Sequence, residues 1–268
     1  GMHLAVFTTL PAVFPSMILS DFALSVPARK HSPSASLFSF LFKISEQGAR
    51  VFAVGLLCGF PVGAKMTADL YRRGAVGKEE AERLAALSLG ASPAFLVAGV
   101  GVGMYKNAFV GILLEFISLF SGILTGMLFA VGKVPSKKES SFSPPPFRPV
   151  ESVRRAGVNA VTLCAFVCLF GAVGYVIRAT LPIPILVSVL LSVTEISGAC
   201  AYIGSMAFPL VLRGTLTAFA VAFSGLSVLW QAMSFLSDTD LRFGRFFAIK
   251  TVQSFLAALL GFVCFSVL

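Results

Sequence analysis

Long apolar runs separated by short polar segments dominate the chain, and such runs predict helices that cross a membrane. Four runs are largely unbroken: Leu4 to Val26, Ala108 to Val131, Val153 to Ile177 and Arg242 to Leu268. Each is long enough to span a bilayer, which takes about 20 helical residues. Residues 34–50 instead mix apolar clusters with charged side chains, a pattern typical of an amphipathic stretch at the membrane surface.

Two shorter apolar runs, Val51 to Phe60 and Leu181 to Val193, end at polar, glycine-containing breaks. The breaks cover residues 58–65 and 192–199, and the first contains Pro61, which has no backbone N–H. Hydrocarbon cannot satisfy the backbone groups that such breaks expose, so the breaks must face a cavity or pack inside protein. Because another apolar run returns after each break, we expect two re-entrant helical hairpins.

Two longer helices are also expected to be broken within the membrane. One runs to about Met104 and is interrupted at Ser88 to Pro93, and the other, Gly214 to Leu236, is interrupted at Phe223 to Ser227. The first of these helices begins with a charged segment that we expect to be solvated, namely Glu79, Glu80, Glu82 and Arg83.

The two halves of the chain carry these features at the same spacing. A shift of 135 residues superposes several small residues, among them Gly63 on Gly198, Gly90 on Gly225, Ser92 on Ser227 and Gly126 on Gly261. The sequence therefore predicts an internal repeat, with residues 1–131 as the first membrane repeat and 153–268 as the second. Residues 132–152, rich in Pro and basic side chains, are the predicted linker.

Charge predicts the orientation of these segments. With the linker in the cytoplasm and three crossings in each half, the Lys and Arg residues other than Lys65, Lys106, Arg178 and Arg213 lie on the cytoplasmic side. The two repeats then point in opposite directions, which is the inverted-repeat architecture of many secondary transporters. We therefore expect an all-α polytopic protein of the bacterial inner (cytoplasmic) membrane, with paired hairpins and broken helices.

Composition excludes several classes of function. The chain is 57% hydrophobic and 12% charged, which does not fit a water-soluble domain. Its net charge of +9 comes from residues between apolar segments and not from a continuous basic face, so the expected partner is the lipid bilayer and no nucleic acid. The sequence contains no motif for a nucleophile, a metal site or a phosphate loop, so we do not expect an enzyme.

The four breaks carry the residues that we expect to bind a small polar solute. These candidates are Gly63, Lys65, Ser88, Ser92, Thr194, Glu195, Ser197, Ser224, Ser227 and Gln231. Two alternatives to a binding role stay open for the charges: Lys65 and Glu195 form an ion pair with each other, or Lys65 extends to the cytoplasmic interface. For the serines, the alternative is packing between helices. No cofactor is expected, although a coupling cation, sodium or a proton, fits this kind of site.

Several of these segments resemble a known family. They are Gly59 to Lys65, Lys78 to Leu84, Ala91 to Pro93, Val100 to Gly103, Thr194 to Gly198 and Phe223 to Val228 with Gln231. Together they resemble the YlbJ group of sporulation integral membrane proteins, within the nucleoside-recognition, or Gate-domain, membrane proteins. The resemblance implies an inner-membrane protein of spore-forming or related bacteria, in a family associated with transport of nucleosides or other small solutes.

Two functions follow as hypotheses. The first is a transporter or permease that binds a small polar solute between inverted repeats near the membrane midplane. The second is a membrane scaffold in envelope or spore assembly that transports nothing. The spacing of Gly122 and Gly126 (GxxxG) permits close helix contacts, either within the chain or in a homo-oligomer.

Overall fold

The computed structural model describes residues 10–26, 33–133 and 144–268, and these residues form helices and no strand. Four helical stretches are long and apolar enough to cross a membrane, namely Ala108–Ala130, Pro149–Thr180, Leu210–Leu236 and Phe243–Ser266. The protein is therefore an all-helical, multi-pass integral membrane protein, as the hydrophobic pattern predicts. The predicted span from Leu4 to Val26 is described from Leu10 onward, and part of the predicted linker, 134–143, lies outside the described residues.

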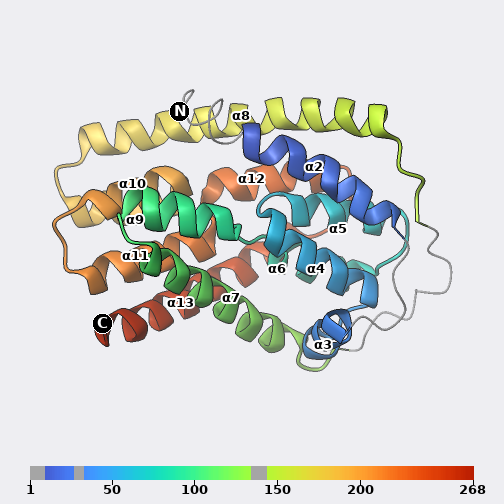
Figure 1. The fold of residues 1–268 in the computed structure, drawn as a ribbon, viewed down its shortest axis with the longest axis horizontal. Coiled ribbons are helices and arrows are strands. Elements are labelled where there is room, and N and C mark those ends of the chain that lie inside the picture. The colour runs from blue at the N-terminus through green and yellow to red at the C-terminus, as the bar shows by residue number, and fades with distance from the viewer. Residues whose placement is uncertain (1–9, 27–32, 134–143) are drawn as a thin grey trace.

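The chain passes through two similar series of helices (Figure 1). The first series is α2 (Leu10–Ser25), α3 (Pro33–Phe42), α4 (Glu46–Cys58), α5 (Val62–Arg72), α6 (Lys78–Leu87), the π-helix η2 (Ala94–Met104) and α7 (Ala108–Ala130). The second series is α8 (Pro149–Thr180), α9 (Pro184–Thr194), α10 (Ile196–Ser205), α11 (Leu210–Phe223), α12 (Gly225–Leu236) and α13 (Phe243–Ser266).

Both expected hairpins and both expected breaks are helix boundaries in the structure. Helix α4 packs on α5 and α9 packs on α10, with short turns between the members of each pair. The segment between α6 and η2 contains the first break, and the second break lies at Ser224, between α11 and α12, where Ser224 and Gly225 both have left-handed φ angles of 72°. The glycine and proline residues therefore predicted these interruptions correctly, because both residue types weaken a continuous helix.

The spacing of the helices follows the 135-residue shift. Moving α7 by this amount gives 243–265, and α13 is Phe243–Ser266. In Figure 1 the hairpin α4–α5 lies toward one end of the long axis and α9–α10 toward the other. Two halves that point in opposite directions would place their hairpins in this way. The inverted repeat itself stays a prediction.

Residues 34–50, predicted as an amphipathic stretch at the membrane surface, belong to two helices in the structure. Helix α3 ends at Phe42, and the chain then turns through Lys43, which has a φ of 50°. Helix α4 starts immediately afterwards because Ser45 caps it, with the Ser45 hydroxyl accepting a 3.1 Å hydrogen bond from the backbone N–H of Gly48. The same serine donates its own N–H to Glu80 Oε1 at 2.8 Å, which ties this turn to α6.

The expectation that the first turns of α6 are solvated holds for Glu79, which is exposed, and is wrong for the other three residues. Glu80, Glu82 and Arg83 are buried, because α4, α5, α7 and α13 all pack against α6. Each of the three has polar partners, as a buried charge requires. For example, Arg83 donates to the carbonyl oxygen of Phe42 at 3.0 Å, and Glu82 pairs with Arg245 at 2.9 Å. These charges hold α6 inside the helical bundle.

The outer faces of three long helices are apolar. Large exposed hydrophobic side chains include Phe116 and Phe120 on α7, Val161 and Leu169 on α8, and Phe255 and Phe262 on α13. A water-soluble protein rarely exposes such continuous apolar area, whereas lipid tails cover it without cost. The two GxxxG glycines of α7 do not lie on these faces. A Cβ placed on Gly126 would lie 2.6 Å from the ring of Phe42, and one on Gly122 would lie 3.2 Å from Gln253 Nε2, so both glycines pack within the chain.

Candidate functional site

Each hairpin tip lies against the helix break of its own half. A Cβ placed on Gly63 would lie 2.2 Å from the carbonyl oxygen of Ser88, so only glycine allows this contact between α5 and the first break. In the second half, a Cβ on Gly225 would lie 3.2 Å from the carbonyl oxygen of Thr194, and Gly225 has a φ of 72°. The backbone of each tip is thus covered by protein, as a break at membrane depth requires.

A cavity of about 100 Å³ lies between the two sets of tips and breaks. Its walls come from both halves of the chain, and the helices α2 and α8 contribute Val13 and Val167. Five of the ten predicted site residues line it: Ser92, Glu195, Ser197, Ser227 and Gln231. The structure therefore brings together polar residues that are far apart in the sequence.

Glu195 occupies the turn between α9 and α10 and caps the N-terminus of α10. Its two carboxylate oxygens accept hydrogen bonds from the backbone N–H groups of Ser197, at 2.9 Å, and Gly198, at 2.5 Å. Glu195 is 5% exposed, and it forms no ion pair with any other described residue. Because the positive end of a helix dipole stabilises an anion, α10 supports a negative charge at the cavity wall.

The other polar residues of the cavity supply hydrogen-bond donors and acceptors. On α12, the Gln231 carboxamide donates to the Ser227 hydroxyl at 3.3 Å, and both residues are buried. In the first break, the Ser92 hydroxyl accepts a 3.3 Å hydrogen bond from the N–H of Phe95. A carboxamide carries two donors and an acceptor, and each hydroxyl can both donate and accept. The set can therefore recognise a solute with several polar groups.

Aromatic side chains from the first half line the same cavity. The rings of Phe60, at the first hairpin tip, and Phe95, at the start of η2, meet edge to face with centroids 6.0 Å apart. Neither ring was among the residues predicted for the site. Phe60 corresponds to Glu195 under the 135-residue shift, so one tip carries an apolar ring where the other carries a carboxylate. The cavity thus combines apolar and polar lining groups.

The other five predicted residues do not line the cavity, and four of them have local packing or hydrogen-bonding roles. Gly63 packs against Ser88, and the remaining three use their hydroxyls within their own helices. These hydroxyls donate to backbone carbonyl oxygens: Ser88 to Leu84 at 2.6 Å, Thr194 to Leu190 at 3.0 Å, and Ser224 to Val221 at 3.3 Å. Their visible role is to satisfy carbonyl groups next to the breaks.

Lys65 was predicted to bind the solute, but it does not line the cavity, and the alternative of an ion pair with Glu195 is wrong as well. Its ammonium forms an ion pair with Asp21 of α2 and a longer one, at 3.5 Å, with Asp69 on its own helix. Asp21 in turn accepts hydrogen bonds from Ser152, at 2.8 Å, and Arg155, at 3.3 Å. Lys65 thus belongs to a polar cluster that joins α2, α5 and α8.

Lys250 is a buried charge that the sequence analysis assigned to the cytoplasmic side. It lies within α13, is 1% exposed, and donates from Nζ to the carbonyl oxygen of Leu89 at 2.9 Å. Its position in the sequence could have indicated this burial. Lys250 lies about two turns beyond Arg242, where a membrane-spanning helix is already inside the bilayer.

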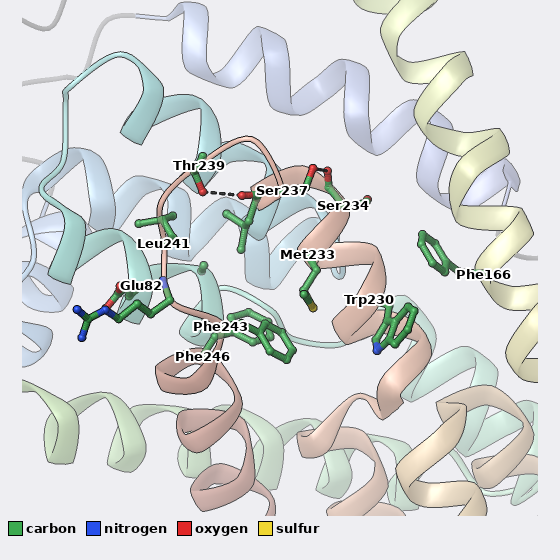
Figure 2. A pocket seen from close by; sticks show the side chains of 13 residues that line it. Glu82, Phe166, Trp230, Met233, Ser234, Ser237, Thr239, Leu241, Phe243 and Phe246 are labelled. Atoms are coloured by element: carbon green, nitrogen blue, oxygen red, sulfur yellow. Dashed lines mark hydrogen bonds between the residues drawn. The ribbon is translucent and has the colours of Figure 1, made fainter.

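A larger cavity of about 590 Å³ lies on another face of α12 and is mainly apolar (Figure 2). Trp230 points into it and meets Phe166 of α8 edge to face, with ring centroids 6.5 Å apart. Glu82 lies at its edge and accepts a 2.9 Å hydrogen bond from the N–H of Arg242. Neighbouring residues of α12 therefore face two cavities, with Gln231 in the polar one and Trp230 in the apolar one.

Comparison with known proteins gives one match to a curated protein. The chain is 25% identical over 260 aligned residues to the sporulation integral membrane protein YlbJ of Bacillus subtilis (strain 168). The alignment covers 81% of this chain and 64% of that protein, so the chain spans less than two thirds of the length of this relative. No family model and no solved structure matches the chain. The predicted resemblance to the YlbJ-like group of sporulation integral membrane proteins is thus confirmed as a similarity of sequence.

Proposed function

We propose that the protein is a small transporter or permease that binds a small polar solute in the cavity between the two hairpin tips. One observation carries the proposal: Ser92, Glu195, Ser197, Ser227 and Gln231, from both halves of a membrane protein, line a single cavity. Polar groups inside a membrane are costly and mark solute or ion pathways. A site between two repeats is also where secondary transporters bind their substrates.

The lining groups define the chemistry of the solute. The Glu195 carboxylate accepts hydrogen bonds or balances a positive charge, and Gln231 and the serine hydroxyls add directional donors and acceptors. Phe60 and Phe95 offer apolar surface to the rest of the solute. A nucleoside, with hydroxyls on a sugar and a planar base, matches this combination and the Gate-domain resemblance. Other small solutes with N–H or O–H donors match it as well.

The size of the cavity constrains how such a solute would bind. About 100 Å³ holds roughly three water molecules at about 30 Å³ each. A solute of nucleoside size therefore requires the hairpin tips to move apart, and the two halves then rock or gate around the site. Glu195 is also the carboxylate best placed to take a coupling sodium ion or proton.

Under this proposal the protein lies in the bacterial inner membrane with the 132–152 linker in the cytoplasm. The basic residues flanking the helices support this orientation, since cytoplasmic loops carry an excess of Lys and Arg. Arg148 at the N-terminus of α8 and Arg72 near the end of α5 belong to the same side.

A second candidate function is a membrane scaffold in envelope or spore assembly. The name of the Bacillus subtilis relative, a sporulation integral membrane protein, favours it, and the name does not mention transport. In a scaffold, Glu195 would act only as the cap of α10, and the hydroxyls only as partners of backbone groups. Such a protein would respond to no solute and would purify together with other envelope proteins.

Thermal unfolding of the purified protein distinguishes the two functions. The screen contains nucleosides, nucleobases, amino acids and simple ions, each in sodium and in potassium buffers. A ligand present at 100 times its Kd and bound only to the folded state adds about 2.7 kcal/mol to the free energy of unfolding, which a melting curve detects. One stabilising chemical class supports the transporter, whereas a folded, monodisperse protein with no response to any compound supports the scaffold.

A further inference from the structure

The side chain of Lys250 is an unusual charge for the interior of a membrane protein. It projects from α13, is 1% exposed, and donates hydrogen bonds to the carbonyl oxygen of Leu89 and to Gln253 Oε1, both at 2.9 Å. A buried ammonium requires strong partners because its hydration is lost. The partners here are oxygen atoms of neutral groups.

Leu89 belongs to the first helix break, directly after the C-terminus of α6. That helix ends at Leu87, and the next helix starts only at Ala94, so Leu89 lies outside both helices and its carbonyl is free to accept from another group. The carbonyl end of a helix carries partial negative charge. In transporters with broken helices, such ends and their unwound carbonyls coordinate cations.

No acidic side chain forms an ion pair with Lys250 among the described residues. The helices packed against α13 are α6, α7 and α11. Glu82 of α6 is already paired with Arg245 at 2.9 Å, and neither Glu80 of α6 nor Glu115 of α7 forms an ion pair with Lys250. The ammonium is therefore held by the Leu89 carbonyl and the Gln253 carboxamide, which are oxygen ligands of the kind that coordinate cations at broken helices.

We infer that the ammonium of Lys250 is the resident cation of the first helix break and fills the place that a bound monovalent metal ion would take. The first break then needs no metal ion of its own. Under the 135-residue shift, the residue of α7 that corresponds to Lys250 is Glu115, so the first half carries no lysine at this position. This inference concerns the break of α6 and η2, and it does not depend on whether the protein transports a solute.

The test is rescue of a shortened side chain by a free cation. Lys250→Ala removes the ammonium and leaves space beside Leu89, whereas Lys250→Met removes the charge and keeps most of the volume. Thermal unfolding of wild type and both variants is measured in methylammonium chloride, sodium chloride and N-methylglucamine chloride at equal ionic strength. N-methylglucamine is too large for the space and serves as the reference.

We expect methylammonium or sodium to raise the melting temperature of Lys250→Ala by about 2–4 °C or more over N-methylglucamine. Wild type and Lys250→Met should show no such gain, the first because its site is filled and the second because no space is left. The inference is overturned when Lys250→Ala gains no more than wild type, or when Lys250→Met gains as much as Lys250→Ala.

Lys250→Ala could unfold during purification, and recovery of folded protein then serves as the readout. Recovery in methylammonium or sodium chloride but not in N-methylglucamine chloride supports a cation site at the first break. Equal loss of the variant in all three salts contradicts it. Neither result depends on solute binding, so the outcome is separate from that of the ligand screen.

Discussion

The carboxylate of Glu195 accepts a 2.5 Å hydrogen bond from the backbone N–H of Gly198, so one side chain both caps α10 and forms part of the cavity wall. This contact fixes the direction of the carboxylate. It also stabilises a negative charge at membrane depth through the N-terminal end of the helix. Under the proposed function, the carboxylate would accept a solute donor without rearranging.

The two faces of α12 give a matched pair of substitutions. Gln231→Leu removes hydrogen-bonding groups from the polar cavity and should abolish the melting-temperature rise caused by the solute. Trp230→Leu changes the neighbouring residue in the apolar cavity and should leave that rise intact. Thermal unfolding with and without the solute checks both. An equal loss in the two variants would mean that the polar cavity is not the binding site.

Close packing at the hairpin tip gives a second prediction. In Gly63→Ala the new methyl group meets the carbonyl oxygen of Ser88, and the backbone must shift, which should cost about 1–3 kcal/mol of the free energy of unfolding. Gly244→Ala is the control, because no atom lies within 4 Å of a Cβ there and the residue is in the first turn of α13.

Gly244→Ala should be neutral or more stable by about 0.5–1 kcal/mol, since alanine favours a helix over glycine. Denaturant-induced unfolding in detergent measures both variants. Similar stabilities for the two would show that the tip of the first hairpin is not packed as described.

Lys65 should act in stability and not in solute binding. Lys65→Met leaves the part-buried carboxylate of Asp21 with Ser152 and Arg155 only. Loss of one partner of a buried pair costs about 3–5 kcal/mol, and the effect here should be smaller because these contacts remain. The solute should still raise the melting temperature of the variant. If a folded Lys65→Met protein lost the solute response, Lys65 would have to be part of the binding site.

The comparison of sequence with structure shows which features are encoded locally. Both hairpins and both breaks were predicted, because Gly59, Pro61 and Gly225 interrupt helices through their own backbone properties. The partner of Lys65 was not predicted, because Asp21 lies in a different apolar run. Only the packing of α2 on α5 brings the two residues together. The burial of Glu82 also depends on a distant residue, Arg245. Long-range charge pairing thus limited the site prediction more than helix assignment did.

A pH-dependent contact should hold the turn between α12 and α13 against α5 and α6. Arg72 lowers the pKa of Asp238, and Lys78 together with Tyr71 lowers that of Asp240. Ion pairs of this kind contribute stability above the unfolded-state pKa, about 3.9, and lose it as the pH falls through the lower folded-state values. The stabilisation should therefore be complete at neutral pH and disappear below about pH 4.

The double variant Asp238→Asn/Asp240→Asn checks this contact. Its melting temperature should lie slightly below that of wild type at pH 7, because exposed pairs contribute little. The difference should close as the pH falls below about 4. A difference that persists or grows at acid pH would contradict the assigned pairs.

The central claim is that the solute binds at Glu195, and equilibrium binding of the solute found in the screen tests it most directly. The Kd is measured for wild type, for Glu195→Gln, and for Glu195→Asp, which keeps the charge and is a good helix cap. We predict that Glu195→Gln weakens binding by at least about tenfold, the value of one hydrogen bond to a charged group, while Glu195→Asp retains more of the affinity. Unchanged affinity in a folded Glu195→Gln protein would contradict the account and leave Glu195 as a helix cap alone.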